Sequence, residues 1–244
     1  MDRSTAPELT DVRNLVLSAL RKEDRQALEP YLQFVSLGSG DVLYEPGYPI
    51  HWVYFPNTAV LSVVTVMADG RAVESDTVGY ESLVGALNAL GDTPAISRTF
   101  NQIPGTALRL PAARLRRRAE ESPAFRKLLI RHTQANLVQA HQSVACNALH
   151  DLTQRLCRWL LMSHDRTARE QIQLTQQFLA TMLGVQRTTV NEALREMADA
   201  GLIRQSRGSI QLLDRERLEA MVCECYDVVR LSLSQLIGDE PVNG

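Results

Sequence analysis

The sequence predicts an α+β protein with three parts in order: a small antiparallel β-roll, one long helix, and two short helices followed by a β-hairpin. Between Phe34 and about Leu110, short β-rich runs alternate with Gly, Pro, Asn and Asp turns. A helical run then extends from Ser122-Pro123 to about His150. After a further amphipathic helix, "LATMLGVQRTTVNEALREMADAGLI" (179–203) places two short helical runs around one glycine.

The first part combines an N-terminal helical segment with the roll. Apolar residues recur at helical spacing over about residues 8–32, where Pro30 breaks the pattern. "MADGRAV" predicts a hairpin with Asp-Gly at its tip, and "ESLVGALNALGD" predicts a short helix inside the roll. Trp52 and Tyr54 are expected in the roll core, with the wall of an effector pocket as the alternative. We expect domain boundaries at 1–122, 123–150 and 151–244.

The long helix carries apolar residues seven apart, a spacing that lets two helices pack along one seam. We therefore expect a homodimer interface, and an ordinary core helix is the alternative. The expected interface residues are Ile130, Leu137, His141 and Val144. A second apolar stripe, expected to face the roll, consists of Leu128, Ala135, Val138 and Ala145.

Residues 175–198 have the pattern of a helix-turn-helix. Ala180 allows the two helices to cross closely, Gly184 tolerates the positive φ of a tight turn, and Thr175 is placed to cap the first helix. The expected shared core consists of Leu179, Leu183, Val185, Val190 and Leu194. In "GLIRQSRGSIQLLD", two short strands flank "SRGS", which predicts a wing hairpin.

Polar side chains gather at the start of the second helix, 186–198, as expected of a helix that enters the major groove of DNA. The formal net charge is only -2, so DNA contact must come from this local clustering. Arg187 suits a bidentate contact to guanine. A helix cap with a solvated face is the alternative explanation for any single residue. The candidate DNA-binding residues are Thr175, Gln176, Gln186, Arg187, Thr188, Thr189, Asn191, Arg195, Arg204 and Arg207.

Nearly the whole chain resembles the Crp/Fnr superfamily of bacterial transcription regulators. The most specific part is "LTQQFLATMLGVQRTTVNEALREMADAGLIRQSRGSIQLLD" (174–214), where Thr175, Arg187, Thr189-Val190, Gly208 and Ile210 match the family pattern. The resemblance implies a cyclic-nucleotide-binding-like β-roll (a jelly roll) as sensor, a dimerisation helix, and a winged helix-turn-helix that binds DNA.

Three departures limit what the resemblance implies. Thr188 stands where the best-known members have a Glu that reads cytosine, so their target sequence is not expected here. Glu81 and Arg98 do not have the arrangement by which the family's cyclic-nucleotide binders hold ribose and phosphate. No cysteine precedes Cys146, which speaks against the N-terminal iron–sulfur cluster of other members.

The remaining chemistry-bearing residues predict no metal and no catalysis. Cys223-Glu224-Cys225 is expected on a helix, where residues two apart point to nearly opposite sides, so packing cysteines are favoured. His132 and His150 share a helix face but are separated by about 27 Å at 1.5 Å per residue. No phosphate loop or nucleophile motif is present in the sequence, so an enzyme is not expected and no cofactor is predicted.

The sequence thus predicts a homodimeric, DNA-binding transcription regulator that reads a pseudo-palindromic site. The alternative is a ligand-binding or protein-interaction module whose winged helix binds protein. Expected partners are double-stranded DNA, a second copy of the chain, RNA polymerase and a small-molecule effector of unknown identity. The sequence has no apparent signal peptide or membrane span, which favours a cytoplasmic protein without membrane contact.

Overall fold

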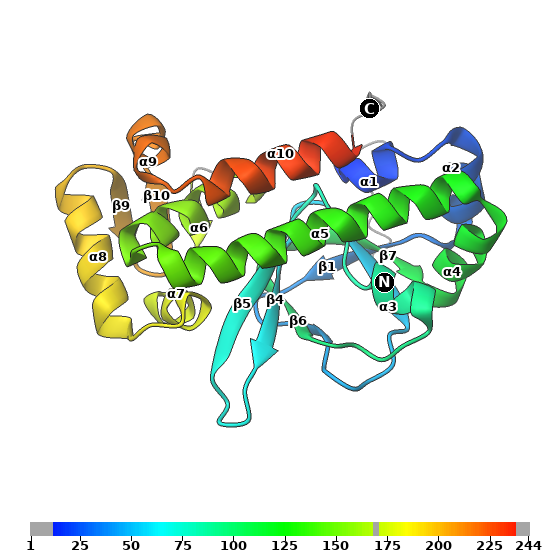
Figure 1. Cartoon of the computed structure of the whole chain (residues 1–244), viewed down its shortest axis with the longest axis horizontal. Coiled ribbons are helices and arrows are strands. Elements are labelled where there is room, and N and C mark those ends of the chain that lie inside the picture. The colour runs from blue at the N-terminus through cyan, green and yellow to red at the C-terminus, as the bar shows by residue number, and fades with distance from the viewer. Residues whose placement is uncertain (1–11, 168–170, 238–244) are drawn as a thin grey trace, which may run out of the picture.

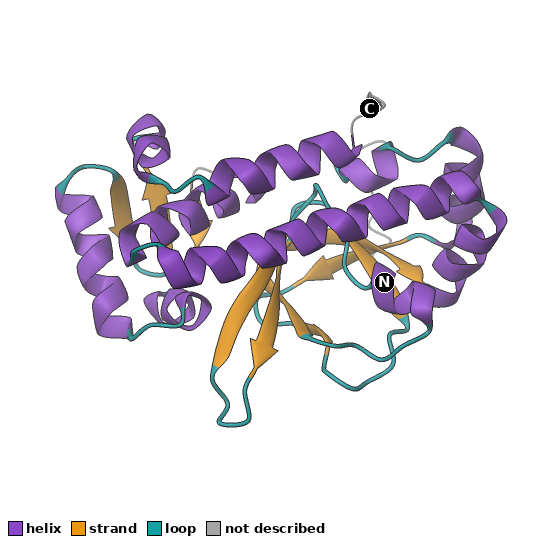
Figure 2. Cartoon of the chain, viewed as in Figure 1, coloured by secondary structure: helices purple, strands orange, loops and turns teal. Residues whose placement is uncertain are grey.

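The structure is a computed structural model that describes residues 12–167 and 171–237. Its N-terminal half is a β-roll of two antiparallel sheets under a long helix (Figures 1 and 2). One sheet has the order β1-β7-β3, with strands β1 (Gln33–Leu37), β3 (Trp52–Pro56) and β7 (Gly105–Pro111). The other has the order β2-β6-β4-β5, with strands β2 (Val42–Tyr44), β4 (Val60–Val66), β5 (Ala72–Val78) and β6 (Arg98–Ile103).

The roll confirms the turn and helix expected inside it. Strands β4 and β5 form the "MADGRAV" hairpin, and Gly70 at its tip has a φ of 83°. The short helix is α3 (Ala86–Gly91). Phe55 and Tyr54 are buried in the roll core, and Trp52 packs under the guanidinium of Arg109, 4.1 Å from the ring centre.

The N-terminal segment is not the single helical run that the sequence predicts over 8–32, of which residues 8–11 lie outside the described residues. It forms α1 (Leu15–Ser18), α2 (Lys22–Leu28) and a 3₁₀ turn, η2 (Glu29–Tyr31). Arg21 is extended and separates the two helices. The buried Asn14 caps α1 and anchors it to the roll, because its side-chain amide donates to the carbonyls of Pro56 and Ser82. Apolar spacing persists across the break and could not reveal it.

Helix α4 (Ala112–Glu121) carries Arg114, Arg116, Arg117 and Arg118, and each of these arginines contacts another residue of the protein. Arg118 pairs with the buried Asp24 at 2.7 Å, and Arg117 pairs with Glu121 at 2.8 Å. Arg116 pairs with Asp92. The pairs of Arg118 with Asp24 and of Arg116 with Asp92 therefore hold α4 against neighbouring segments.

The long helix α5 (Pro123–Leu149) runs along most of the long axis of the molecule (Figure 1). Ser122 caps it by accepting from the amide of Phe125, and Pro123 occupies its first turn. Of the predicted second stripe, Ala135 is buried and Leu128, Val138 and Ala145 are half-buried, while the buried side of α5 also carries the polar residues His132, Gln139 and Ser143. No helix within the described ranges is both long and apolar enough to cross a bilayer.

The C-terminal part lies at the end of α5 (Figure 1). It contains α6 (Leu152–Thr167), β8 (Gln171–Gln173), α7 (Gln176–Leu183), α8 (Arg187–Asp199), β9 (Ile203–Ser206), β10 (Ser209–Leu212), α9 (Arg215–Met221) and α10 (Cys225–Ile237). Strands β9 and β10 are the predicted wing hairpin, and β8 adds a third strand in the order β8-β10-β9. Helix α10 returns along α5 in the opposite direction (Figure 1).

The two parts pack on a shared core. Val60 and Ile103 of the roll lie in the same buried cluster as Leu156 and Leu160 of α6. Polar contacts cross the same boundary: the indole of Trp159 donates to Glu74 at 2.8 Å, and Arg166 pairs with Glu81 at 2.6 Å. The roll is therefore in direct contact with α6, the helix on which the helix-turn-helix packs.

Candidate nucleic-acid interface

The helix-turn-helix is built as the sequence predicts. Thr175 caps α7 by accepting from the amide of Phe178 at 3.1 Å, and Gly184 makes the turn with a φ of 65°. Ala180 is buried at the crossing with α8. Four of the five expected core residues are buried, and Val185 is partly buried against the same cluster. The packed helix-turn-helix thus fixes the position of the side chains at the start of α8.

The start of α8 presents polar side chains to solvent. Gln186, the residue before the first turn, is extended and exposed, and Arg187, Thr188 and Thr189 follow it on the surface. Val190 is the first residue of this segment to enter the core. The exposed candidates therefore share one end of the helix, which is the end expected to enter a major groove.

The other DNA-binding candidates surround this end. Thr175, Asn191, Arg195, Arg204 and Arg207 are exposed, and Gln176 is half-buried. The side-chain amide of Gln176 donates to Asn191 at 2.8 Å, so these two side chains form a pair in the free protein.

The arginines of this surface differ in how they are engaged. Arg195 lies 3.9 Å from Asp199, and Arg204 donates to Gln211 at 3.4 Å. Within the described ranges, no carboxylate lies at ion-pair distance from Arg187 or Arg207. These two guanidinium groups are available for an anionic partner.

A groove joins α7, α8 and the wing. It has a volume of about 450 Å³ and is lined by Thr175, Gln176, Arg187, Gln205 and Arg207, among others. DNA-binding candidates from α7, α8 and the wing hairpin thus line one concave surface. Sequence spacing alone could not establish this arrangement.

A second cavity, of about 490 Å³, lies between the roll and α5. Its lining includes Tyr44, Asp76, His132 and Asn136, and none of the described residues around it is Lys or Arg. Burial raises the pKa of Asp76 well above its usual value, although Arg166 opposes this effect. The cavity therefore offers hydrogen-bonding and apolar groups without the cation that a buried phosphate requires.

Glu81 and Arg98 lie outside this cavity. The carboxylate of Glu81 accepts from Arg166 of α6 and from the amide of Gly79 at 3.1 Å. Arg98 pairs with Glu45 at 3.2 Å. Glu81 thus connects the roll to the C-terminal part, and neither residue is placed to hold a nucleotide.

The predicted seam of α5 is exposed in the single chain. The side chains of Ile130, Leu137 and Val144 are 50%, 54% and 70% exposed, and His141 is also exposed. Apolar residues this exposed at seven-residue spacing favour a surface that packs against another chain.

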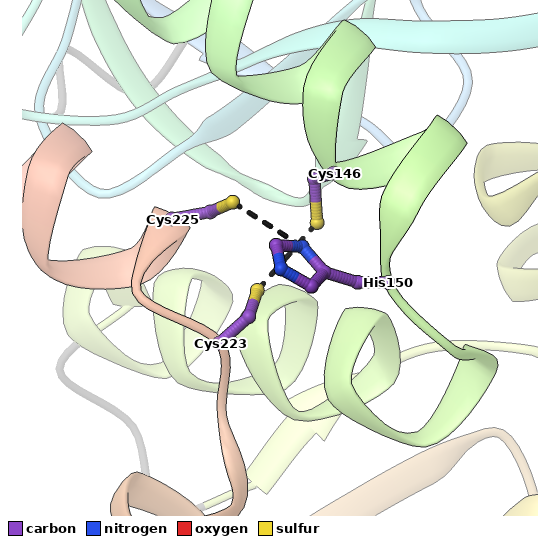
Figure 3. A group of neighbouring side chains, drawn as sticks. All are labelled: Cys146, His150, Cys223 and Cys225. Atoms are coloured by element: carbon purple, nitrogen blue, oxygen red, sulfur yellow. Dashed lines mark hydrogen bonds between the residues drawn. The ribbon is translucent and has the colours of Figure 1, made fainter.

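The sequence prediction that Cys223 and Cys225 share one helix is wrong, because Cys223 precedes α10 and Cys225 is its first residue; both are buried, as expected of packing cysteines. The two residues lie where the chain bends between α9 and α10, with Val222 extended, so they do not point to opposite sides of a helix. Together with Cys146 and His150 of the end of α5, they place four ligand atoms within 4.8 Å of one another (Figure 3). The signal that could have indicated this group is Cys146-x-x-x-His150, because residues four apart share a helix face.

Comparisons with known proteins agree with this geometry. Residues 154–221 match the Crp-like helix-turn-helix domain. The chain is 25% identical over 199 residues to a CRP-like cAMP-activated global transcriptional regulator of Mycobacterium tuberculosis, covering 79% of this chain and 89% of that protein. It is 26% identical over 195 residues to the transcriptional regulator SdrP of Thermus thermophilus, covering 77% and 93%.

Solved structures share the fold. FixK2 from Bradyrhizobium japonicum superposes with a TM-score of 0.67 at 18% identity, over 79% of this chain and 98% of that one. A Crp/Fnr-family regulator from Eubacterium rectale gives a TM-score of 0.67 at 15% identity, over 84% and 96%. The matched helix-turn-helix domain and the relatives that regulate transcription together support a DNA-binding transcription regulator. Residues 154–221 belong to the Crp-like helix-turn-helix family, and the chain as a whole has the fold of Crp/Fnr regulators.

Proposed function

We propose that the chain acts as a homodimer that reads a pseudo-palindromic DNA site with the start of α8. The observation that carries this proposal is the exposed cluster from Gln186 to Thr189, held at one end of a helix by a rigid turn. In this scheme residues 1–122 form the sensor, residues 123–150 the dimerisation helix, and residues 151–244 the DNA-binding domain.

The residues around the groove divide into two roles. Arg187 is proposed to donate two hydrogen bonds to a guanine, while Gln186, Thr188 and Asn191 reach neighbouring bases or phosphates. Asn191 must exchange its hydrogen bond with Gln176 or read DNA together with it. The remaining candidates are proposed to contact phosphates: Thr175, Thr189, Arg195, Arg204 and Arg207.

Dimerisation through α5 would set the distance between the two α8 helices that contact DNA. Ile130, Leu137, His141 and Val144 are proposed to meet their counterparts across a two-fold axis. Two recognition helices in a two-fold dimer bind half-sites about one helical turn, roughly 34 Å, apart. The operator would therefore carry the same two-fold symmetry as the protein.

The cavity of the roll is proposed to hold an effector that contacts the dimerisation helix. Thr133, Asn136 and Leu137 line it, and Leu137 also belongs to the proposed seam. An occupant can change DNA binding only through different affinities for two arrangements of this helix. Because the described residues that line the cavity include no Lys or Arg, we propose an effector without a phosphate, unlike the cAMP named for the mycobacterial relative.

Selection of DNA by the purified protein tests the function. Genomic fragments that the protein retains are sequenced, and binding to the recovered motif is then measured over a range of salt concentrations. We expect a pseudo-palindromic motif and a steep fall in affinity with salt, by about 0.9 log units per log unit of salt for each phosphate neutralised. No enriched motif together with salt-independent binding would favour a protein-interaction module instead.

A further inference from the structure

We propose that Cys146, His150, Cys223 and Cys225 form a tetrahedral site for one zinc ion, which fastens the end of the dimerisation helix to the bend before α10. The site lies outside the DNA-reading groove and the roll cavity, and neither proposed role uses these residues. Zinc favours a set of three thiolates and one imidazole in structural sites.

The interatomic distances match a single metal ion. Cys146 Sγ lies 3.6 Å from Cys223 Sγ, and Cys225 Sγ lies 3.5 Å from His150 Nδ1 (Figure 3). Four ligands at the usual Zn–S distance of about 2.3 Å occupy the corners of a tetrahedron whose edges are about 3.8 Å. In an iron–sulfur cluster the cysteines bind different irons and stand further apart, so these distances favour a mononuclear site.

Two elements distant in sequence supply the ligands in pairs. Cys146 and His150 are four residues apart and share a face at the end of α5. Cys223 lies in the bend after α9, and Cys225 is the first residue of α10. All three cysteines are buried, whereas the burial of His150 is intermediate, which leaves a route for metal entry.

Groups around the ligands also suit a metal. Glu224 Oε2 lies 3.3 Å from His150 Nε2 and can accept a hydrogen bond from Nε2–H, which leaves Nδ1 free to bind a metal. A carboxylate behind a metal-binding histidine fixes the ring in this way. The side-chain amide of Gln142 donates to Cys225 Sγ at 3.4 Å. Such contacts orient ligands and would not be required by cysteines that only pack.

A cation lies close to the site as well. Arg158 donates to Ser143, one turn before Cys146 on α5, and its Nη1 atom is buried without a hydrogen-bond partner in the described part of the chain. Three thiolates and a dication carry a net charge of about -1. Arg158 is placed to offset this charge.

The bound ion would join segments that are 77 residues apart in the chain. Leu218 of α9 belongs to the core of the winged helix, so the bend is continuous with the DNA-binding module. The metal would therefore hold this module against α5. Removal of the ion should lower the thermal stability of the folded chain, because binding to the native state alone stabilises it.

Metal content of the reduced full-length protein tests the site. We expect about one zinc per chain after addition of zinc and removal of excess, and a Co²⁺ complex with the absorption of tetrahedral thiolate coordination. Cys223→Ala should abolish both. Cys157→Ala is the matched control, because Cys157 is equally free and buried but packs in the winged-helix core, and it should retain both.

A second variant separates the site from folding. Glu224→Ala removes an exposed side chain behind His150 and should weaken metal affinity about 10- to 100-fold in a folded protein. The same metal content in Cys223→Ala as in wild type would overturn the proposal. Failure of the reduced wild-type protein to take up either zinc or cobalt would also overturn it. Formation of a Cys146–Cys223 disulfide on oxidation of such a protein would then identify the cysteines as a redox pair.

Discussion

His132 shows how one buried side chain joins the long helix α5 to the roll. Its Nε2 atom accepts from the amide of Leu83 at 3.2 Å and from the hydroxyl of Ser82 at 2.6 Å. The ring must therefore carry its proton on Nδ1, which has no hydrogen-bond partner among the described residues. Burial lowers the pKa of His132 to about 4, so the folded protein holds it neutral.

This histidine predicts a loss of stability in mild acid. Below a pH of about 6.5 the unfolded chain binds a proton at His132, whereas the folded chain does not until about pH 4. The free energy of unfolding should therefore fall as the pH drops through this window, by up to about 3 kcal/mol from this residue. Chemical denaturation at pH 7 and pH 5, at one protein concentration, measures the change.

Comparison of two variants isolates the contribution of His132. His132→Gln should lose this part of the pH dependence, and His51→Gln, at an exposed loop position, should keep it. An identical change in unfolding free energy between the two pH values for both variants would show that His132 is not the group responsible.

At the scale of elements, the turn between α7 and α8 depends on one glycine. Gly184 has a φ of 65°, a conformation that costs other residues about 1–2 kcal/mol. Gly184→Ala should therefore destabilise the protein by about that amount, with additional loss of DNA affinity if α8 is displaced. Unfolding by urea measures the effect.

The matched control is Gly91→Ala. Gly91 ends α3 outside the left-handed region, and an added Cβ there meets only Thr93 at ordinary contact distance. Its effect should be small. Equal effects of the two substitutions would show that the turn does not require the conformational freedom of glycine.

The elements that the sequence predicts well are those fixed by local rules. Thr175, Gly184 and the apolar spacing of 179–194 specify the helix-turn-helix within a span of about twenty residues. Ser122-Pro123 marks the start of α5 in the same way, as a cap followed by a residue suited to the first turn.

The features that the sequence could not supply depend on contacts between distant segments. The place where α1 starts is set by the bonds of Asn14 to the carbonyls of Pro56 and Ser82, which are more than 40 residues away in the chain. The pairing of Glu81 with Arg166 joins residues 85 apart. The cysteine group required two pairs of residues to be considered together, and an incorrect helix assignment at Cys223 concealed it.

At the scale of the whole molecule, α5 is the element that connects every proposed activity. It carries the exposed seam on one side, lines the roll cavity, and ends at the cysteine group beside the winged helix. In the proposed dimer, a change in the pairing of the two α5 helices would move both DNA-binding modules together. DNA binding should therefore depend on the oligomeric state.

Charge placed in the seam should dissociate the dimer. Leu137→Asp puts an unpaired carboxylate where two copies are proposed to meet, and burial of such a charge is strongly unfavourable. Sedimentation velocity at micromolar concentration should show a monomer. Met67→Asp, at a side chain 56% exposed beside the β4–β5 turn, is the control and should remain dimeric. Unchanged sedimentation of Leu137→Asp would place the interface elsewhere.

Base discrimination by Arg187 tests the central claim most directly. Binding of wild type and Arg187→Ala is measured on the selected duplex, on duplexes with single symmetric base-pair changes, and on random DNA. If Arg187 reads a guanine, the variant should lose about 1–3 kcal/mol of discrimination at one symmetric pair of positions, and much less affinity for random DNA. An equal loss on every duplex would contradict base reading by the start of α8.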